Sequence, residues 1–194
     1  SDKFTVDYQK QLDDFFELAR KKVNQETELL VGPETTIQEG IWENTFEDSY
    51  TFRVIKDFQK DFPNLNILIG ASTYKMFLPG EEISSTARSF PNKDVFYDAY
   101  NSAIFIPDTG KVMIYHKTKL VPGVEKIPFP AVFNKVSALV VDLGGVSGSL
   151  GSKNTFSSFD ISGRKLLPLI CYESIYGEII TNRKADILCV ITND

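Results

Sequence analysis

Hydrophobic residues recur at spacings of three and four near the start of the chain, over residues 5–24. The residues that carry this spacing are Tyr8, Leu12, Phe15, Phe16, Ala19 and Val23. The spacing predicts an amphipathic helix that packs on a sheet. A second stretch of the same kind covers residues 47–62 and is broken by Pro63-Asn64. Two amphipathic helices are therefore expected in the first third of the chain.

Short apolar runs predict the strands. The predicted strands are residues 28–31, 65–70, 71–74, 98–106, 111–116, 156–161, 165–170 and 185–194. Asp108-Thr109-Gly110 and Ser162-Gly163-Arg164 each predict a tight turn between two of them. Residues 79–93 are expected to form a loop insertion, and residues 174–182 a helix directly after Cys171. Strand–helix alternation at both ends, with meandering strands between, predicts an α/β domain layered around a two-sheet core.

Composition narrows the possible classes of protein. The chain has 194 residues, of which 42% are hydrophobic and 24% charged, enough to bury one substantial core. Its net charge of -5 disfavours nucleic acid as a partner. The two cysteines form no disulfide framework, and the single histidine, His116, excludes a two-histidine metal site. No apolar run approaches the ~18 residues of a spanning helix. The chain is expected to be soluble and to lack the segment that would follow its last strand.

Three residues with complementary chemistry each lie where an apolar run ends. They are Glu34, Lys117 and Cys171. A carboxylate can take the proton of a thiol, and an ammonium can stabilise the thiolate and then the oxyanion. The set therefore predicts acyl transfer through a thioester, without a catalytic histidine.

Each of these residues also has a simpler interpretation. Cys171 lies at a strand-to-helix elbow, where the carboxyl edge of a sheet binds ligands and a helix amino terminus favours a thiolate. Most cysteines, however, are small buried hydrophobes, and Cys189 is expected to be one. Glu34 could begin a solvated loop, and Lys117 could be a surface lysine. Glu125, eight residues beyond Lys117, could hydrogen-bond the lysine or be one more loop acid.

The segment after Glu125 is unusually apolar for a loop. Residues 129–143 could be an extra element on the core or an exposed surface that faces lipid.

The motifs together resemble the nitrilase (carbon-nitrogen hydrolase) superfamily, and most closely the apolipoprotein N-acyltransferase family within it. They are Pro33-Glu34-Thr35, Tyr115-His116-Lys117-Thr118-Lys119-Leu120-Val121-Pro122, Ile170-Cys171-Tyr172-Glu173 and Ile191-Thr192-Asn193-Asp194. Tyr172 stands where soluble amidases usually carry tryptophan. Lys119 departs from the usual histidine, Gly32 from the usual aromatic residue, and Gly123-Val124-Glu125 from the usual Phe-Gly-Glu. These departures are expected to affect the lining of the pocket more than the chemistry.

The resemblance implies a fold, a site and a reaction. The fold would be a nitrilase-like four-layer α-β-β-α sandwich truncated at its C-terminus, with residues 1–194 forming one incomplete catalytic domain whose flanking membrane helices are absent. The catalytic residues would be Glu34, Lys117 and Cys171, supported by Glu125, Tyr172 and Glu173. No metal or organic cofactor would be required. Residues 129–143 would act as a lid that touches lipid.

The reaction implied by the resemblance has a phospholipid as acyl donor and a lipidated apolipoprotein as acceptor. The full-length protein would lie in the bacterial inner membrane with this domain on the periplasmic side, and the fragment alone is expected to be weak or inactive. Two alternatives remain open. One is a soluble nitrilase-type amidase that hydrolyses a small non-peptide C–N bond, and the other is an inactive fragment that binds lipid or protein.

Overall fold

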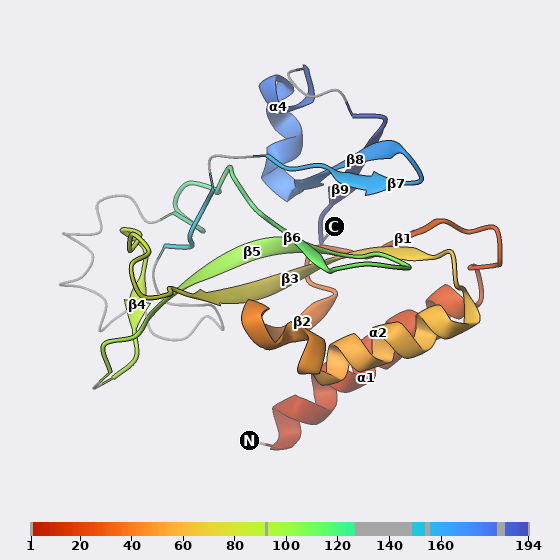
Figure 1. Ribbon diagram of the computed structural model, residues 1–194, viewed down its shortest axis with the longest axis horizontal. Coiled ribbons are helices and arrows are strands. Elements are labelled where there is room, and N and C mark those ends of the chain that lie inside the picture. Colours follow the sequence, from red (N-terminus) through yellow and green to blue (C-terminus); the bar gives the residue numbers. More distant parts are fainter. Residues whose placement is uncertain (1, 92, 127–148, 154–155, 182–184, 194) are drawn as a thin grey trace.

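The computed structural model describes residues 2–91, 93–126, 149–153, 156–181 and 185–193. Its helices and sheets stack in four layers (Figure 1). Two helices, α1 (Asp2–Arg20) and α2 (Tyr50–Asp61), cover one face of a six-stranded sheet. A three-stranded sheet lies over the other face, and the short helix α4 (Gly177–Thr181) covers its outer side. The predicted α-β-β-α sandwich is confirmed.

The larger sheet is built around two long central strands. Its strands are β1 (Leu29–Val31), β2 (Ile37–Trp42), β3 (Asn66–Met76), β4 (Arg88–Ser89), β5 (Phe96–Ile106) and β6 (Met113–His116). The strand order is β1-β3-β5-β4, with β2 also paired to β3 and β6 also paired to β5. Because β3–β5 and β5–β6 are antiparallel while β1–β3 is parallel, β1, β3 and β6 run in the same direction. The loops after β1 and β6 therefore open toward the same end of the sheet.

The smaller sheet contains β7 (Phe159–Ile161), β8 (Arg164–Ile170) and β9 (Ile187–Ile191). The turn between β7 and β8 holds Ser162 and Gly163 at φ values of 52° and 78°, the conformation that a two-residue hairpin turn requires. Strands β8 and β9 are parallel, and the register aligns Ile170 with Ile191. The residues that follow these two strands, Cys171 and Thr192, therefore leave the sheet side by side.

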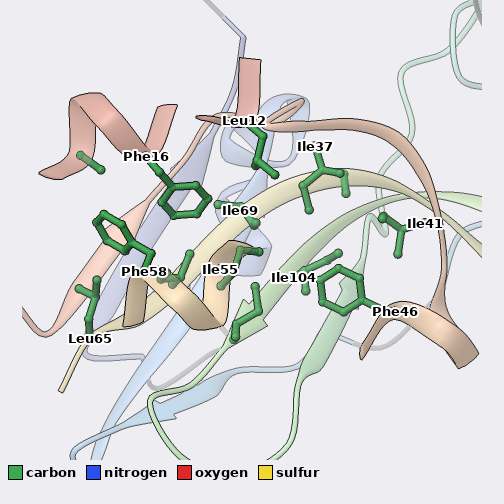
Figure 2. Packing of buried hydrophobic residues seen from close by; sticks show 14 residues of the cluster. Leu12, Phe16, Ile37, Ile41, Phe46, Ile55, Phe58, Leu65, Ile69 and Ile104 are labelled. Carbon is green, nitrogen blue, oxygen red and sulfur yellow. The ribbon is translucent and has the colours of Figure 1, made fainter. Parts of the chain in front are cut away.

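Among the described residues, three apolar clusters hold the layers together. The first lies between the helices and the larger sheet (Figure 2). It includes Leu12, Phe16, Ile37, Ile41, Phe46, Ile55, Phe58, Leu65, Ile69 and Ile104. A second joins the two sheets through residues such as Phe105, Phe159 and Ile170, and a third joins β8 to α4 through Leu167, Leu169 and Ile179. Burial of each large apolar side chain stabilises the fold by about 2 kcal/mol.

The predicted helices near the start of the chain are confirmed, with shorter bounds. The first ends at Arg20 rather than at residue 24. The second begins at Tyr50 because the Ser49 side chain caps it by accepting a hydrogen bond from the Phe52 N–H. It is preceded by a 3-10 helix, η1 (Glu43–Asp48), which the sequence pattern did not indicate.

Three predictions about the strands and the last helix need correction. The strands predicted at residues 65–70 and 71–74 are one continuous strand, β3, which begins at Asn66, and β2 was not predicted at all. The helix predicted over residues 174–182 begins only at Gly177, because residues 171–175 form a 3-10 helix, η3 (Cys171–Ile175). The loop insertion at residues 79–93 contains the two-residue strand β4. The predicted apolar lid, residues 129–143, lies outside the described residues.

Candidate active site

The loop that carries Glu34 lies directly against β3. The N–H of Gly70 donates a hydrogen bond to the carbonyl oxygen of Pro33 (3.0 Å). A Cβ atom at Gly70 would overlap the backbone of Glu34, so only glycine permits this close approach. The Glu34 side chain is 12% exposed, so it is not the residue of a solvated loop.

Lys117 follows the last residue of β6 and is 1% exposed, so the interpretation as a surface lysine is wrong. Its Nζ lies 2.8 Å from Oε1 of Glu125 and 3.4 Å from Oε1 of Glu34. The hydrogen bond suggested between Lys117 and Glu125 is therefore present. One ammonium lies between two carboxylates, each of which is only slightly exposed.

Asn101 completes this cluster, and the sequence interpretation missed it. Its Nδ2 donates to Oε1 of Glu34 (2.6 Å) and to Oε1 of Glu125 (2.9 Å). The backbone carbonyl oxygen of Asn101 accepts a hydrogen bond from the backbone N–H of Lys117 (2.8 Å). The sequence did contain a signal for this residue, because Asn101 is a single amide side chain within the largely apolar strand β5. We call Glu34, Asn101, Lys117 and Glu125 the glutamate–lysine cluster.

The cluster favours the ionised form of Glu125. Burial by itself would raise the pKa of this carboxyl group. Hydrogen bonds from Lys117, from the Val121 N–H and from Asn101, together with the lysine charge, outweigh burial and lower the pKa below its usual range. Glu125 therefore remains a fixed negative partner for Lys117 at neutral pH. Glu34 lies further from Nζ and, within the described residues, its side chain receives a hydrogen bond from Asn101 besides its contact with the lysine.

Cys171 lies at a strained backbone elbow immediately after β8. Its φ is +46°, a value that non-glycine residues adopt at a cost of about 1–3 kcal/mol, mostly at functional sites. The thiol is half-buried. The proposed stabilisation by a nearby α-helix amino terminus is wrong, because α4 begins six positions later and has five residues. The turn at Cys171, where the 3-10 helix η3 begins, carries the chain away from β8.

Glu173 ties the Cys171 elbow to the segment that follows Lys117. Its side chain is fully buried. Oε2 accepts the N–H of Ile170 (2.9 Å), while Oε1 accepts the hydroxyl of Tyr115 (2.7 Å) and the N–H of Thr118 (2.6 Å). The Thr118 hydroxyl and the Lys119 N–H also donate to Oε1. One carboxylate therefore fixes the end of β8 against the end of β6.

The residues after β9 connect the same edge to Glu34. The carbonyl oxygen of Thr192 accepts the N–H of Glu34 (3.5 Å), and Oδ1 of Asn193 accepts the N–H and hydroxyl of Thr35 (both 3.0 Å). Thr192 leaves the smaller sheet beside Cys171. The loops after β1, β6, β8 and β9 thus converge at one edge. Within the described parts of the chain, the Cys171 thiol makes no hydrogen bond to Glu34 or Lys117.

The remaining predicted residues lie around this convergence or away from it. Tyr172 is half-buried and its ring meets that of Tyr176 edge-on at 5.4 Å. Cys189 is half-buried in β9 against the cluster between the sheets, and burial raises the pKa of its thiol. Across the described residues, no group of three or more histidine, cysteine or acidic side chains has a geometry that could hold a metal ion.

Two of the departures from the family motifs have structural consequences. A Cβ at Gly32 would point at Thr36, Ile69 and Phe15, so this position faces the core under α1 and does not line the site. The expectation that Gly32 changes the lining of the pocket is therefore wrong. Lys119 does lie near the elbow: its Nζ pairs with Glu178 at 2.9 Å.

A buried lysine between two glutamates, beside a cysteine elbow on an α-β-β-α sandwich, defines a nitrilase-like protein. The model of the carbon-nitrogen hydrolase family matches residues 4–194, and the chain belongs to that family. Solved structures agree on the fold. A CN-hydrolase superfamily protein from Xanthomonas campestris superposes with a TM-score of 0.59 at 13% identity, covering 96% of this chain and 60% of that one. An amidase of the nitrilase superfamily from Nesterenkonia gives 0.55 at 15% identity, covering 95% and 59%.

Curated relatives are more similar in sequence. The apolipoprotein N-acyltransferase of Chlorobaculum tepidum is 36% identical over 106 residues, which is 50% of this chain and 20% of the relative. That of Thermotoga maritima is 29% identical over 150 residues, 73% of this chain and 28% of the relative. The chain therefore matches about a fifth to a quarter of the length of these relatives.

Proposed function

We propose that this chain is the catalytic domain of an N-acyltransferase that moves a fatty acyl group from a phospholipid to the N-terminal amine of a diacylglyceryl-cysteine apolipoprotein. The observation that carries the proposal is the burial of Lys117 between Glu34 and Glu125 at the edge where the Cys171 elbow leaves β8. The similarity to curated apolipoprotein N-acyltransferases supports this choice of substrates over others in the same family.

In the first step Glu34 takes the proton of the Cys171 thiol, and the sulfur attacks the carbonyl carbon of the acyl ester. The tetrahedral oxyanion is stabilised by the Lys117 ammonium and by a backbone N–H near Tyr172. Glu34 then gives its proton to the departing alkoxide. The C–O bond breaks, the lysophospholipid leaves, and the acyl group remains as a thioester on Cys171.

In the second step the free amine of the acceptor attacks the thioester carbon. Glu34 accepts a proton from the attacking nitrogen, an amide bond forms, the C–S bond breaks, and Glu34 returns the proton to the departing Cys171 thiolate. Glu125 does not exchange protons in this scheme. Its lowered pKa keeps it charged, so it holds Lys117 in place while Glu34 changes its protonation state. The different surroundings of the two glutamates thus support different roles.

The proposal extends to the surroundings of the domain. Residues 1–194 would form one catalytic domain of a longer protein in the bacterial inner membrane, on its periplasmic side, where both lipid substrates are accessible. Among the described helices, none has the length and hydrophobicity needed to cross a bilayer.

The test uses the natural protein in detergent with a labelled phospholipid, beside its Cys171→Ala and Cys171→Ser variants. Intact mass should show an acyl adduct on the parent that hydroxylamine removes. The adduct should be absent from Cys171→Ala, and in Cys171→Ser any adduct should resist hydroxylamine. Cys189→Ala is the matched control and should retain the adduct, because Cys189 is packed within β9.

Two results would overturn the proposal. Release of ammonia from small amides, without an acyl adduct, would assign the chain to an amidase activity instead. Neither adduct nor hydrolysis, in a protein that folds normally, would leave a lipid- or protein-binding role.

A further inference from the structure

A second cluster of buried polar side chains lies on the face of the larger sheet opposite to the glutamate–lysine cluster. Glu43, the first residue of η1, places its Oε1 2.5 Å from Nε2 of His116. The same oxygen accepts the hydroxyl of Thr73 (2.8 Å), which in turn lies 2.7 Å from the hydroxyl of Ser102. We call Glu43, Thr73, Ser102 and His116 the glutamate–histidine cluster.

This cluster spans the strands that also carry the glutamate–lysine cluster. Thr73 belongs to β3, Ser102 to β5 and His116 to β6, and the register pairs Ser102 directly with His116. Successive side chains of a strand point to opposite faces. Asn101 and Lys117, the neighbours of Ser102 and His116, therefore point to the face that holds Glu34 and Glu125, while the glutamate–histidine cluster occupies the face toward α2.

The end of β6 is held from both faces of the larger sheet. The Glu173 carboxylate accepts hydrogen bonds from Tyr115, Thr118 and Lys119 on one face, and the glutamate–histidine cluster adds a second anchor on the other. The strand has four residues, and in the described chain it pairs with β5 alone. Short edge strands with one pairing partner open locally more easily than central strands. The His116 side chain is 4% exposed, and its ring lies 4.0 Å from that of Tyr100. The side chain is thus fixed by the Glu43 carboxylate and by the Tyr100 ring, immediately before Lys117.

We infer that Glu43 and His116 are positioning residues that fix the end of β6 and thereby hold the Lys117 ammonium between Glu34 and Glu125. They act through the backbone of Lys117 and do not touch the reacting atoms. Loss of the contact would let residue 117 move away from the two carboxylates and from the thiol. This inference rests on the proposed function, in which Lys117 stabilises the Cys171 thiolate.

The charge on Glu43 is consistent with this role. Burial favours its neutral form, but the hydrogen bond and charge of His116 and the hydrogen bond of Thr73 outweigh burial and lower the pKa of Glu43. The carboxylate is therefore ionised at neutral pH and binds His116 through a charge-assisted hydrogen bond. A neutral hydrogen bond at the same place would hold the strand end less firmly.

The experiment measures the alkylation rate of Cys171 by iodoacetamide as a function of pH, with peptide mapping to separate it from Cys189. His116→Phe keeps the ring against Tyr100 but removes the bond to Glu43, and Glu43→Met removes the acceptor. Both variants should alkylate about tenfold more slowly at neutral pH, with the pH profile of the reaction shifted upward. His116→Gln, whose amide can still donate to Glu43, should restore most of the rate.

Thr51→Val is the matched control. Thr51 is 1% exposed and donates a hydrogen bond to Glu39 on the helix side of the larger sheet, away from β6. This variant should lower the melting temperature but leave the pH profile of Cys171 unchanged. If loss of stability alone explained the effect of the His116 and Glu43 variants, Thr51→Val would reproduce it.

The outcomes separate this inference from the proposed function. A parent Cys171 that reacts no faster than a model thiol would contradict the proposed activation of the thiol and the inference with it. A parent that reacts fast, with folded His116→Phe and Glu43→Met variants whose profiles match the parent, would overturn the positioning role only. If His116→Phe fails to fold, Glu43→Met and His116→Gln still decide the question.

Discussion

The glutamate–lysine and glutamate–histidine clusters lie on opposite faces of the same strand ends, but they differ in the balance of acidic and basic side chains. The first has two carboxylates for one ammonium and borders the Cys171 elbow. The second pairs one carboxylate with one imidazole and two hydroxyl groups that connect three strands. In the first cluster two carboxylates share one ammonium, whereas in the second the hydroxyl groups and the imidazole link β3, β5 and β6. Under the proposed function, the first face performs the chemistry and the second supports it.

The largest effect should come from removing the shared cation. Lys117→Met leaves Glu34 and Glu125 close together, with the Asn101 amide donating to both carboxylates. We expect loss of the acyl adduct and a decrease of about 3 kcal/mol in the free energy of unfolding, measured by urea titration. Ser102→Ala, in the other cluster, removes one neutral hydrogen bond and should cost about 1 kcal/mol while the adduct remains. Equal stability of Lys117→Met and the parent would show that the two carboxylates are not charged together.

A smaller effect should follow from displacing Glu34 without changing any charge. Gly70→Ala would push the Glu34 backbone away from β3 and should cost about 2 kcal/mol, with slower alkylation of Cys171. Gly177→Ala is the matched control, because nothing lies within 4 Å of the position of its added Cβ. A Gly70→Ala variant with the alkylation rate of the parent would mean that the position of Glu34 does not determine the reactivity of the thiol.

The smallest effect should be the response to acid. The pKa values of Glu43 and Glu125 are both lowered in the folded protein from an ordinary value of 4.5. The unfolded chain therefore binds protons first as the pH falls, so the stability contributed by each residue is complete above 4.5 and is lost as the pH drops through the folded value. Urea titrations at neutral pH and below 4.5 should show a smaller acid-induced loss in Glu43→Gln and in Glu125→Gln than in the parent. An unchanged loss in either variant would exclude that residue as a source of the acid response.

The sequence predicted the layers better than the connections between them. Periodicity identified both long helices, because each buries one apolar face on the larger sheet. Strand β2 was missed because Gln38, Glu39 and Gly40 interrupt its apolar pattern. The structure explains this glycine, since a Cβ at Gly40 would overlap the ring of Tyr74 on the neighbouring strand. Such a constraint comes from a residue distant in sequence and leaves no local signal.

The candidate site shows the same limit. Glu34, Lys117 and Cys171 were identified by their motifs, and the structure places their loops at one edge, while their catalytic roles stay predictions. Asn101 was not identified, since its importance depends on two carboxylates that only the folded chain brings to it. The strand and the elbow at Cys171 were predicted, but the helix after them was placed too early. The buried Glu173 carboxylate binds the Ile170 N–H and favours a 3-10 helix over an α-helix there.

The backbone of Cys171 adopts a strained conformation at the position of the proposed nucleophile. Its φ of +46° is a conformation that glycine adopts without strain. Glycine at this position would relieve about 1 kcal/mol of backbone strain and, under the proposed function, would remove the sulfur that forms the thioester. Mutation toward a more stable fold and retention of the reaction therefore act in opposite directions at residue 171. Under the proposed function, the backbone strain at this elbow comes with placing a thiol where the acyl group is transferred.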